Sequence, residues 1–121
     1  MHAVADSNIL IDYLLGVGEA KRELARYSGV TMSYMTWMEV MAGARPGEDE
    51  RRTRAFLARY RVHPIDADVG ERAVALRREH RIRLADAVIW ATAQRLGLLF
   101  VTRNTKDFPV GDAGIRVPYT R

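Results

Sequence analysis

Residues 98–102, Leu-Leu-Phe-Val-Thr, form an uncharged and mostly apolar run near the end of the chain. A continuous apolar strand of this kind is typical of a parallel sheet that is covered on both faces. The preceding segment, residues 84–96, is apolar nearly all round, as expected for a helix that packs against such a sheet. Together the two segments favour an α/β domain in which helices cover a parallel sheet.

Short apolar strands and amphipathic helices alternate through all 121 residues. The pattern predicts strands at 2–5, 30–33, 62–65, 98–102 and 115–117, with Pro64 restricting the third strand to a sheet edge. It predicts helices at 7–15, 19–27, 36–44, 48–60, 66–80 and 84–96. We therefore expect a single domain, residues 1–121, with a central and mainly parallel sheet of about 4–5 short strands flanked by helices.

The composition excludes several classes of site. The chain has no cysteine, which rules out disulfides, thiolate metal sites and a cysteine nucleophile and fits a reducing cytoplasm. The longest uncharged stretch, residues 27–38, is too short for a membrane helix, and the N-terminus lacks the pattern of a signal peptide. We therefore expect a cytoplasmic protein without a membrane span.

The charge balance points gently toward nucleic acid. The formal net charge is +4, and only Lys21 and Lys106 among the 19 basic residues are not arginine. Arginine can hold a phosphate group through two parallel hydrogen bonds. Arginine-rich codon usage explains the same composition, and we expect the arginines at 51–61 and 77–83 to form a solvated face. The three histidines have no metal-ligand spacing.

Four acidic residues occupy related positions in the predicted fold. Asp6 follows the first strand, and Glu39 lies in the first turn of the helix after the second strand. Asp86 lies in the first turn of the helix that leads into strand 98–102, and Asp107 lies in the loop after that strand. Ligands of parallel sheets bind beyond the carboxyl ends of the strands, and a helix antiparallel to the strands begins at that same edge. We therefore expect the four carboxylates to converge.

Each acid also has a local structural explanation. Asp6 is a good helix N-cap, and Thr36 with Glu39 matches a capping box. Asp86 suits the helix dipole, and Asp107 suits a turn. Four independent caps would not need to cluster, however. At ~5 Å and an effective dielectric constant of ~20, each carboxylate pair repels by ~3 kcal/mol, so a cation must compensate. Oxygen ligands select Mg²⁺ or Mn²⁺, which suit phosphodiester hydrolysis.

Four segments carry a further pattern: DSNILID at 6–12, TWMEVMAG at 36–43, LADAVIWATA at 84–93 and VTRNTKDF at 101–108. In this order and spacing they resemble the signature segments of PIN-domain ribonucleases, most closely the VapC-like toxins of bacterial type II toxin–antitoxin pairs. The resemblance covers essentially the whole chain. It implies the PIN-like three-layer sandwich, with a central parallel sheet between helices.

The resemblance also implies a function. It implies a Mg²⁺- or Mn²⁺-dependent endoribonuclease that cuts RNA, such as transfer or ribosomal RNA, and that forms a homodimer silenced by a VapB-like antitoxin. The implied metal-binding and catalytic acids are Asp6, Glu39, Asp86 and Asp107, with supporting hydrogen bonds from Ser7, Asn8, Thr102 and Asn104. The alternative is a PIN-like module that binds RNA or a protein partner without cutting, although the four intact acids argue against it.

Two departures from the family pattern concern packing. Residues 84–85, Leu-Ala, stand where many relatives have a proline, and Trp90 stands where a small residue is usual, which leaves its packing or a role in the dimer contact open. Methionines recur at 32, 35, 38 and 41. We expect this stripe to be mainly core, with a share in a dimer or antitoxin contact.

Overall fold

The computed structural model describes residues 1–121 and contains a five-stranded sheet in the order β3-β2-β1-β4-β5. Every neighbouring pair of strands is parallel. The strands are β1 (His2–Ala5), β2 (Gly29–Ser33), β3 (Arg61–His63), β4 (Leu99–Val101) and β5 (Ile115–Arg116). The predicted α/β fold with a parallel sheet is confirmed, and β3 lies at an edge directly before Pro64, as that proline requires.

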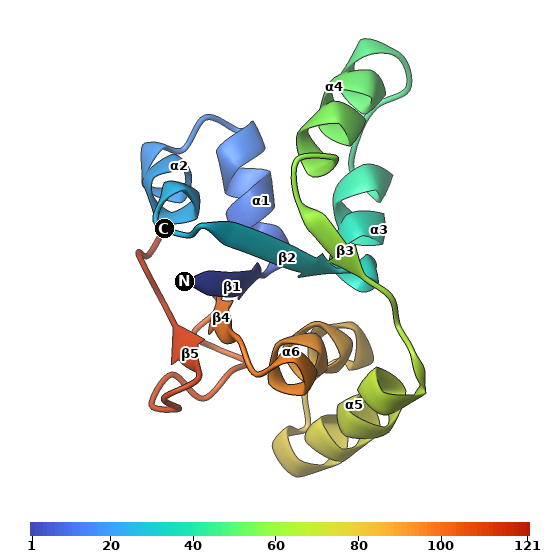
Figure 1. Ribbon diagram of the computed structural model, residues 1–121, viewed down its shortest axis with the longest axis vertical. Coiled ribbons are helices and arrows are strands. Elements are labelled where there is room, and N and C mark those ends of the chain that lie inside the picture. The colour runs from blue at the N-terminus through green and yellow to red at the C-terminus, as the bar shows by residue number, and fades with distance from the viewer.

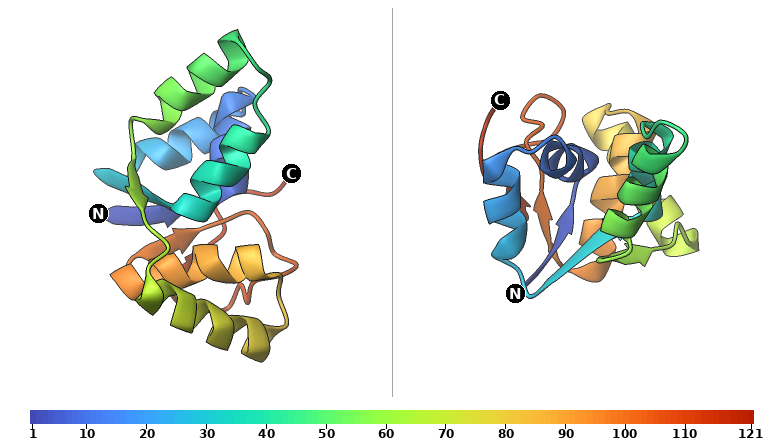
Figure 2. Two further views of the ribbon diagram at one scale, coloured as in Figure 1. Left: turned by 90° about the vertical axis from the view of Figure 1, so that its right-hand side faces the viewer. Right: turned by 90° about the horizontal axis from the view of Figure 1, so that it is seen from above.

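Helices cover both faces of the sheet and give three layers. They are α1 (Ser7–Leu14), α2 (Gly18–Ala25), α3 (Tyr34–Ala42), α4 (Glu48–Leu57), α5 (Ala67–His80) and α6 (Leu84–Leu96). Helices α1 to α4 lie on one side of the sheet and α5 and α6 on the other (Figure 1). In the left view of Figure 2, α5 and α6 run side by side, and the two chain termini lie on opposite sides of the molecule. None of the six helices has the length and apolar content that a membrane span requires.

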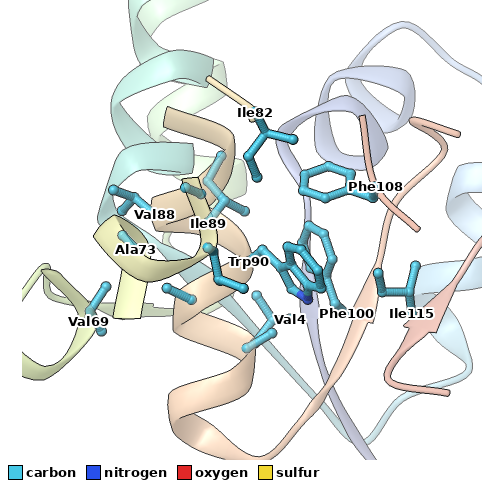
Figure 3. Close-up of a cluster of buried hydrophobic side chains, with 14 residues drawn as sticks. Val4, Val69, Ala73, Ile82, Val88, Ile89, Trp90, Phe100, Phe108 and Ile115 are labelled. Carbon is cyan, nitrogen blue, oxygen red and sulfur yellow. The ribbon is translucent and has the colours of Figure 1, made fainter. Parts of the chain in front are cut away.

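Strand alternation divides the core into two clusters. On β1, Val4 points to the α5 and α6 side, whereas Ala3 and Ala5 point to the side of α1 to α4. Because β1 is the middle strand, its pleat sends side chains into both clusters. Figure 3 shows the first cluster, in which Trp90 and Phe100 lie close to Phe108 from the loop after β4.

Trp90 belongs to this core. Its side chain is 2% exposed, and its ring centroid lies 4.8 Å from His80 and 5.7 Å from Phe108. The ring therefore joins α5, α6 and the loop after β4. Because Trp90 is buried within the chain, it is not available for a dimer contact.

The methionine stripe is mainly core, as expected. Met32 is fully buried in β2, and Met35 and Met41 pack against the two clusters from α3. Met38 is the exception, since its side chain is exposed on α3.

Helix α3 starts at Tyr34, two residues before the predicted start at residue 36. The reason is Ser33, whose Oγ accepts a hydrogen bond from the Met35 N–H at 3.1 Å and so caps the helix. The capping box that the sequence suggested for Thr36 and Glu39 is therefore not formed. The prediction that Glu39 lies in the first turn is also wrong, because the earlier start moves it into the second turn.

Candidate active site

Asp6 lies directly after the central strand β1, and its side chain is buried. As the N-cap of α1 it accepts a hydrogen bond at Oδ1 from the Ser7 N–H at 2.7 Å. Its Oδ2 accepts from the Thr102 hydroxyl at 2.7 Å and from the Asn8 amide at 3.2 Å. Thr102 follows β4, the strand beside β1, so two neighbouring strand ends fix this carboxylate. The capping role that the sequence suggested for Asp6 is real, and it coexists with a place at the carboxyl edge.

Burial raises the pKa of Asp6 from 3.8 to about 6. The hydrogen bonds from Thr102 and Ser7 oppose this shift, whereas the nearby charges of Asp86 and Glu39 add to it. The charged form of Asp6 is therefore costly in the isolated protein. A cation at this edge would relieve both the burial cost and the repulsion.

Glu39 reaches the same edge from α3. The Ser7 hydroxyl donates to its Oε1 at 2.6 Å and lies 3.2 Å from the Thr36 hydroxyl. Ser7 thus connects the first two acids, because its backbone binds Asp6 and its side chain binds Glu39.

Asp86 is buried in the first turn of α6, which begins at the carboxyl edge because it runs antiparallel to the strands. Both of its oxygens are engaged by one arginine. Arg83 Nε lies 3.0 Å from Oδ2, and Arg83 Nη2 lies 3.3 Å from Oδ1. The sequence predicts Arg83 on a solvated face and not in this pair, although the spacing of three residues between Arg83 and Asp86 at a helix start was a usable signal.

Asp107 lies in the turn after β4 and is tied to Asn104. The Asn104 amide donates to Asp107 Oδ2 at 3.0 Å, and the Asp107 N–H donates to Asn104 Oδ1 at 3.1 Å. The Asn104 N–H in turn donates to the Thr102 hydroxyl at 3.0 Å. Thr102 therefore links the loop that carries Asp107 to the Asp6 carboxylate.

Electrostatic interactions connect the four acids, with Asp107 connected to the others only through Arg83. Asp6 responds to Asp86 and Glu39, and the pKa of the Arg83 guanidinium is raised by Asp86 first and then by Glu39 and Asp107. As arranged here, no three Asp, Glu or His side chains are close enough together to share one metal ion. Arg83 donates hydrogen bonds to both oxygens of Asp86, and Ser7 donates one to Glu39. The side chains of Asp86 and Glu39 would therefore have to turn in order to bind one metal ion together with Asp6.

Comparison with known families matches residues 3–111 to the PIN domain. The chain belongs to the PIN-domain family. The residues that carried the resemblance in the sequence, with Asp6 after β1 and Asp86 at the start of α6, thus lie on the fold that they predicted.

The relatives of this PIN domain are VapC-type proteins, so the predicted resemblance is confirmed. The chain is 36% identical over 115 residues to Ribonuclease VapC10 of Mycobacterium tuberculosis, and the match covers 88% of this chain and 86% of that protein. Its structure resembles a toxin–antitoxin complex from Klebsiella pneumoniae with a TM-score of 0.92 and 46% identity, over 98% of this chain and 99% of that one. DNA-bound VapBC from Salmonella typhimurium, at 23% identity over 96% of both chains and a TM-score of 0.74, shares the fold.

A further buried carboxylate of this PIN domain, Asp12, lies outside the predicted site and was not predicted from the sequence. Arg103 binds both of its oxygens at 2.6 and 3.1 Å, while the Tyr119 hydroxyl donates at 2.8 Å and Arg121 at 2.9 Å. Burial alone would raise the pKa of Asp12, but the hydrogen bonds from Arg103 and Tyr119 outweigh it and hold the pKa below its usual value. Periodicity carries no signal for a contact between α1 and the C-terminal end of the chain.

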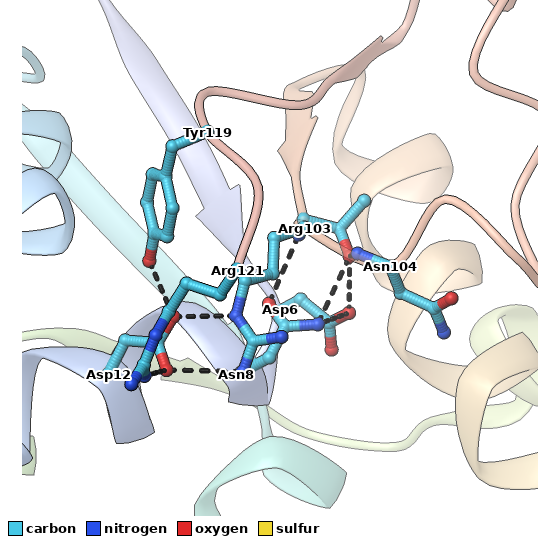
Figure 4. A network of polar contacts seen from close by, with 8 residues as sticks. Asp6, Asn8, Asp12, Arg103, Asn104, Tyr119 and Arg121 are labelled. Atoms are coloured by element: carbon cyan, nitrogen blue, oxygen red, sulfur yellow. Dashed lines mark hydrogen bonds and ion pairs between the residues drawn. The ribbon is translucent and has the colours of Figure 1, made fainter.

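The Asp12 network touches the site through Asn8. The Arg103 N–H donates to Asn8 Oδ1 at 3.2 Å, and Asn8 donates to Asp6 from its amide nitrogen. Figure 4 shows Asn8 among these groups, with the Asp12, Tyr119 and Arg121 contacts beside it. Asp12 is fully paired with cations within the chain, so its role here is to hold the surroundings of Asp6.

Proposed function

We propose that this PIN domain, spanning residues 1–121, is a Mg²⁺- or Mn²⁺-dependent endoribonuclease and the toxin of a toxin–antitoxin pair. One observation carries the proposal: Asp6 is buried with a raised pKa beside Asp86 and Glu39, at the carboxyl edge of a parallel sheet. Such a cluster is unstable without a cation and has the oxygen chemistry of a hard-metal site. The names of its relatives, Ribonuclease VapC10 and a toxin–antitoxin complex, support the same assignment.

The acids Asp6, Glu39, Asp86 and Asp107 would hold the ion, since all four are coupled to this edge. A bound divalent ion would help to generate the attacking hydroxide and would neutralise charge that develops on the phosphate. The donor set fits Mg²⁺ and Mn²⁺ because it offers only oxygen atoms and no thiolate.

The supporting residues act by fixing the acids. Thr102, Ser7 and Asn8 donate to Asp6 and so favour its charged form and a single orientation. Asn104 fixes Asp107 in the same way. These hydrogen bonds leave the carboxylates of Asp6 and Asp107 pre-oriented, which lowers the reorganisation that these two acids need on binding an ion.

The proposed substrate is RNA, in particular transfer RNA or ribosomal RNA. The chain carries a net charge of +4 although its site is acidic, so basic side chains elsewhere on the surface are available for the phosphate backbone. A toxin that cuts RNA acts where RNA is abundant, and we therefore place it in the cytoplasm.

We propose two protein partners, a VapB-like antitoxin and a second copy of the chain. The acidic edge attracts a basic side chain from an inhibitor by simple Coulomb attraction. For the homodimer, the support is the group of exposed apolar side chains on α3 and at the start of α6, namely Tyr34, Met38 and Leu84.

The test is cleavage of purified transfer and ribosomal RNA by the isolated chain, in EDTA and in Mg²⁺ or Mn²⁺. We expect cleavage with either ion, none in EDTA and none for Asp6→Asn. Asp66→Asn is the matched control, since Asp66 is also a helix N-cap but lies in front of α5, and it should cut like the wild type. Cleavage that survives EDTA or Asp6→Asn contradicts the proposal. RNA binding without any cleavage supports the non-cutting module instead.

A further inference from the structure

Arg83 is a cation in direct contact with the acidic edge, and the sequence predicts no functional role for it. It stands directly before α6, and its guanidinium engages both oxygens of Asp86. The two side chains differ sharply in exposure, 73% for Arg83 and 7% for Asp86. A buried carboxylate is thus neutralised by an arginine that reaches in from solvent.

The influence of Arg83 extends beyond Asp86. Its guanidinium also interacts favourably with the charges of Glu39 and Asp107. Asp6, by contrast, has no cation among its hydrogen-bond partners, which are Thr102, Ser7 and Asn8, and only the more distant Arg103 guanidinium interacts with its charge. In the isolated protein, Arg83 therefore supplies the positive charge that three of the four acids share.

We propose that Arg83 is the resting counter-cation of this site, and that a divalent ion must displace it from Asp86 in order to bind. This inference rests on the proposed function. A metal ion at Asp86 needs at least one carboxylate oxygen, and Arg83 donates a hydrogen bond to each of the two. A guanidinium and a divalent cation at the same carboxylate also repel each other.

Displacement is feasible because Arg83 has no second anchor. Asp86 is the sole hydrogen-bond and ion-pair partner of its guanidinium, and most of its side chain is in water. The guanidinium can therefore turn outward with little loss of packing. The competition sets the metal concentration at which the site fills, and it keeps the acids neutralised when no metal is bound.

The test measures Mn²⁺ affinity by isothermal titration calorimetry without RNA. Arg83→Gln removes the competing charge, so it should bind Mn²⁺ at least about fivefold more tightly than the wild type. Arg83→Lys keeps the charge but loses the two-pronged contact, so its affinity should fall between the two. Arg26→Gln is the matched control, because Arg26 also pairs with a buried acid three residues away, with exposures of 57% and 4%, and that acid, Glu23, lies outside the site.

Thermal unfolding gives a second readout. In EDTA, Arg83→Gln should melt below the wild type because the acids have lost their counter-cation, and its melting temperature should rise more on adding Mn²⁺. A purely structural role for Arg83 would lower the melting temperature with and without Mn²⁺ by the same amount.

The outcomes separate this inference from the proposed function. If the wild type binds Mn²⁺ and Arg83→Gln binds it equally or more weakly, the inference is overturned and the proposed function stands. If neither the wild type nor Arg83→Gln binds Mn²⁺, both fail. Tighter binding by Arg83→Gln with an unchanged Arg26→Gln control supports the exchange.

Discussion

At the scale of single residues, Asp6 combines two roles that affect stability in opposite directions. As the N-cap of α1 it stabilises the helix start, and as a buried acid beside Asp86 and Glu39 it destabilises the isolated fold. The hydrogen bond from Thr102 decides which oxygen faces the neighbouring strand. The site is therefore held in place by contacts that do not remove its electrostatic cost.

This conflict predicts a pH-dependent effect of Asp6→Asn in metal-free protein. The folded pKa of about 6 lies above the ordinary value of 3.8, so the folded state binds more protons, and the stability that Asp6 contributes falls as pH rises from about 4 to 6. Above pH 6 the variant should be more stable than the wild type by about 1–3 kcal/mol, and the difference should vanish near pH 4. Urea unfolding across this pH range in EDTA measures it.

The control for Asp6→Asn is Asp66→Asn at the start of α5. A backbone hydrogen bond from Val69 lowers the pKa of Asp66, so neutralising it should slightly lower the melting temperature at neutral pH. If Asp6→Asn behaves like Asp66→Asn, Asp6 is only a cap.

Asp12 is a buried acid whose negative charge is compensated by ion pairs and hydrogen bonds within the chain. Two arginines and Tyr119 surround it, so breaking one contact leaves an imperfectly paired charge. Tyr119→Phe should lower the free energy of unfolding by about 1 kcal/mol. Tyr60→Phe is the control, because Tyr60 is half-buried like Tyr119 but its hydroxyl has no hydrogen-bond partner in the chain. This substitution should change the free energy of unfolding little. Equal effects of the two substitutions would show that the Tyr119 hydroxyl contributes nothing.

At the scale of elements, periodicity predicted the order and type of every strand and helix, because apolar spacing reports which face is buried. It could not place the start of α3, where Ser33 and Thr36 are both acceptable caps and the choice depends on where β2 ends. It identified the acids that follow strands, since topology alone brings them to one edge. It missed Arg83 and the Asp12 network, because such pairs depend on side-chain direction and on contacts between distant segments.

The cap of α3 can be tested directly. Ser33→Ala removes the acceptor for the Met35 N–H and should lower the free energy of unfolding by about 1 kcal/mol. Glu39→Gln should not cost a comparable amount, because Glu39 caps nothing and its partner Ser7 can still donate to the amide oxygen. Chemical denaturation of both variants gives the comparison. A larger loss for Glu39→Gln would restore the capping box of Thr36 and Glu39.

At the scale of the whole molecule, the sheet brings the site together from residues far apart in sequence. The segment after β4 is fastened on both sides, to Asp12 through Arg103 and to Glu23 through Arg116, which binds both Glu23 oxygens at 2.7 and 2.9 Å. Phe108, which belongs to the same segment, also packs against the rings of Trp90 and Phe100 in the core. The loop that carries Asp107 is therefore anchored by ion pairs and by packing.

The central claim is that the acids at this edge hold a divalent ion, and diffraction tests it most directly. A crystal of the chain grown with MnCl₂ and measured at the manganese absorption edge should show an anomalous peak between the carboxylates of Asp6 and Asp86, with Arg83 turned away from Asp86. If Mn²⁺ is bound elsewhere in the crystal and this edge shows no peak, while Arg83 still engages both Asp86 oxygens, the account is contradicted.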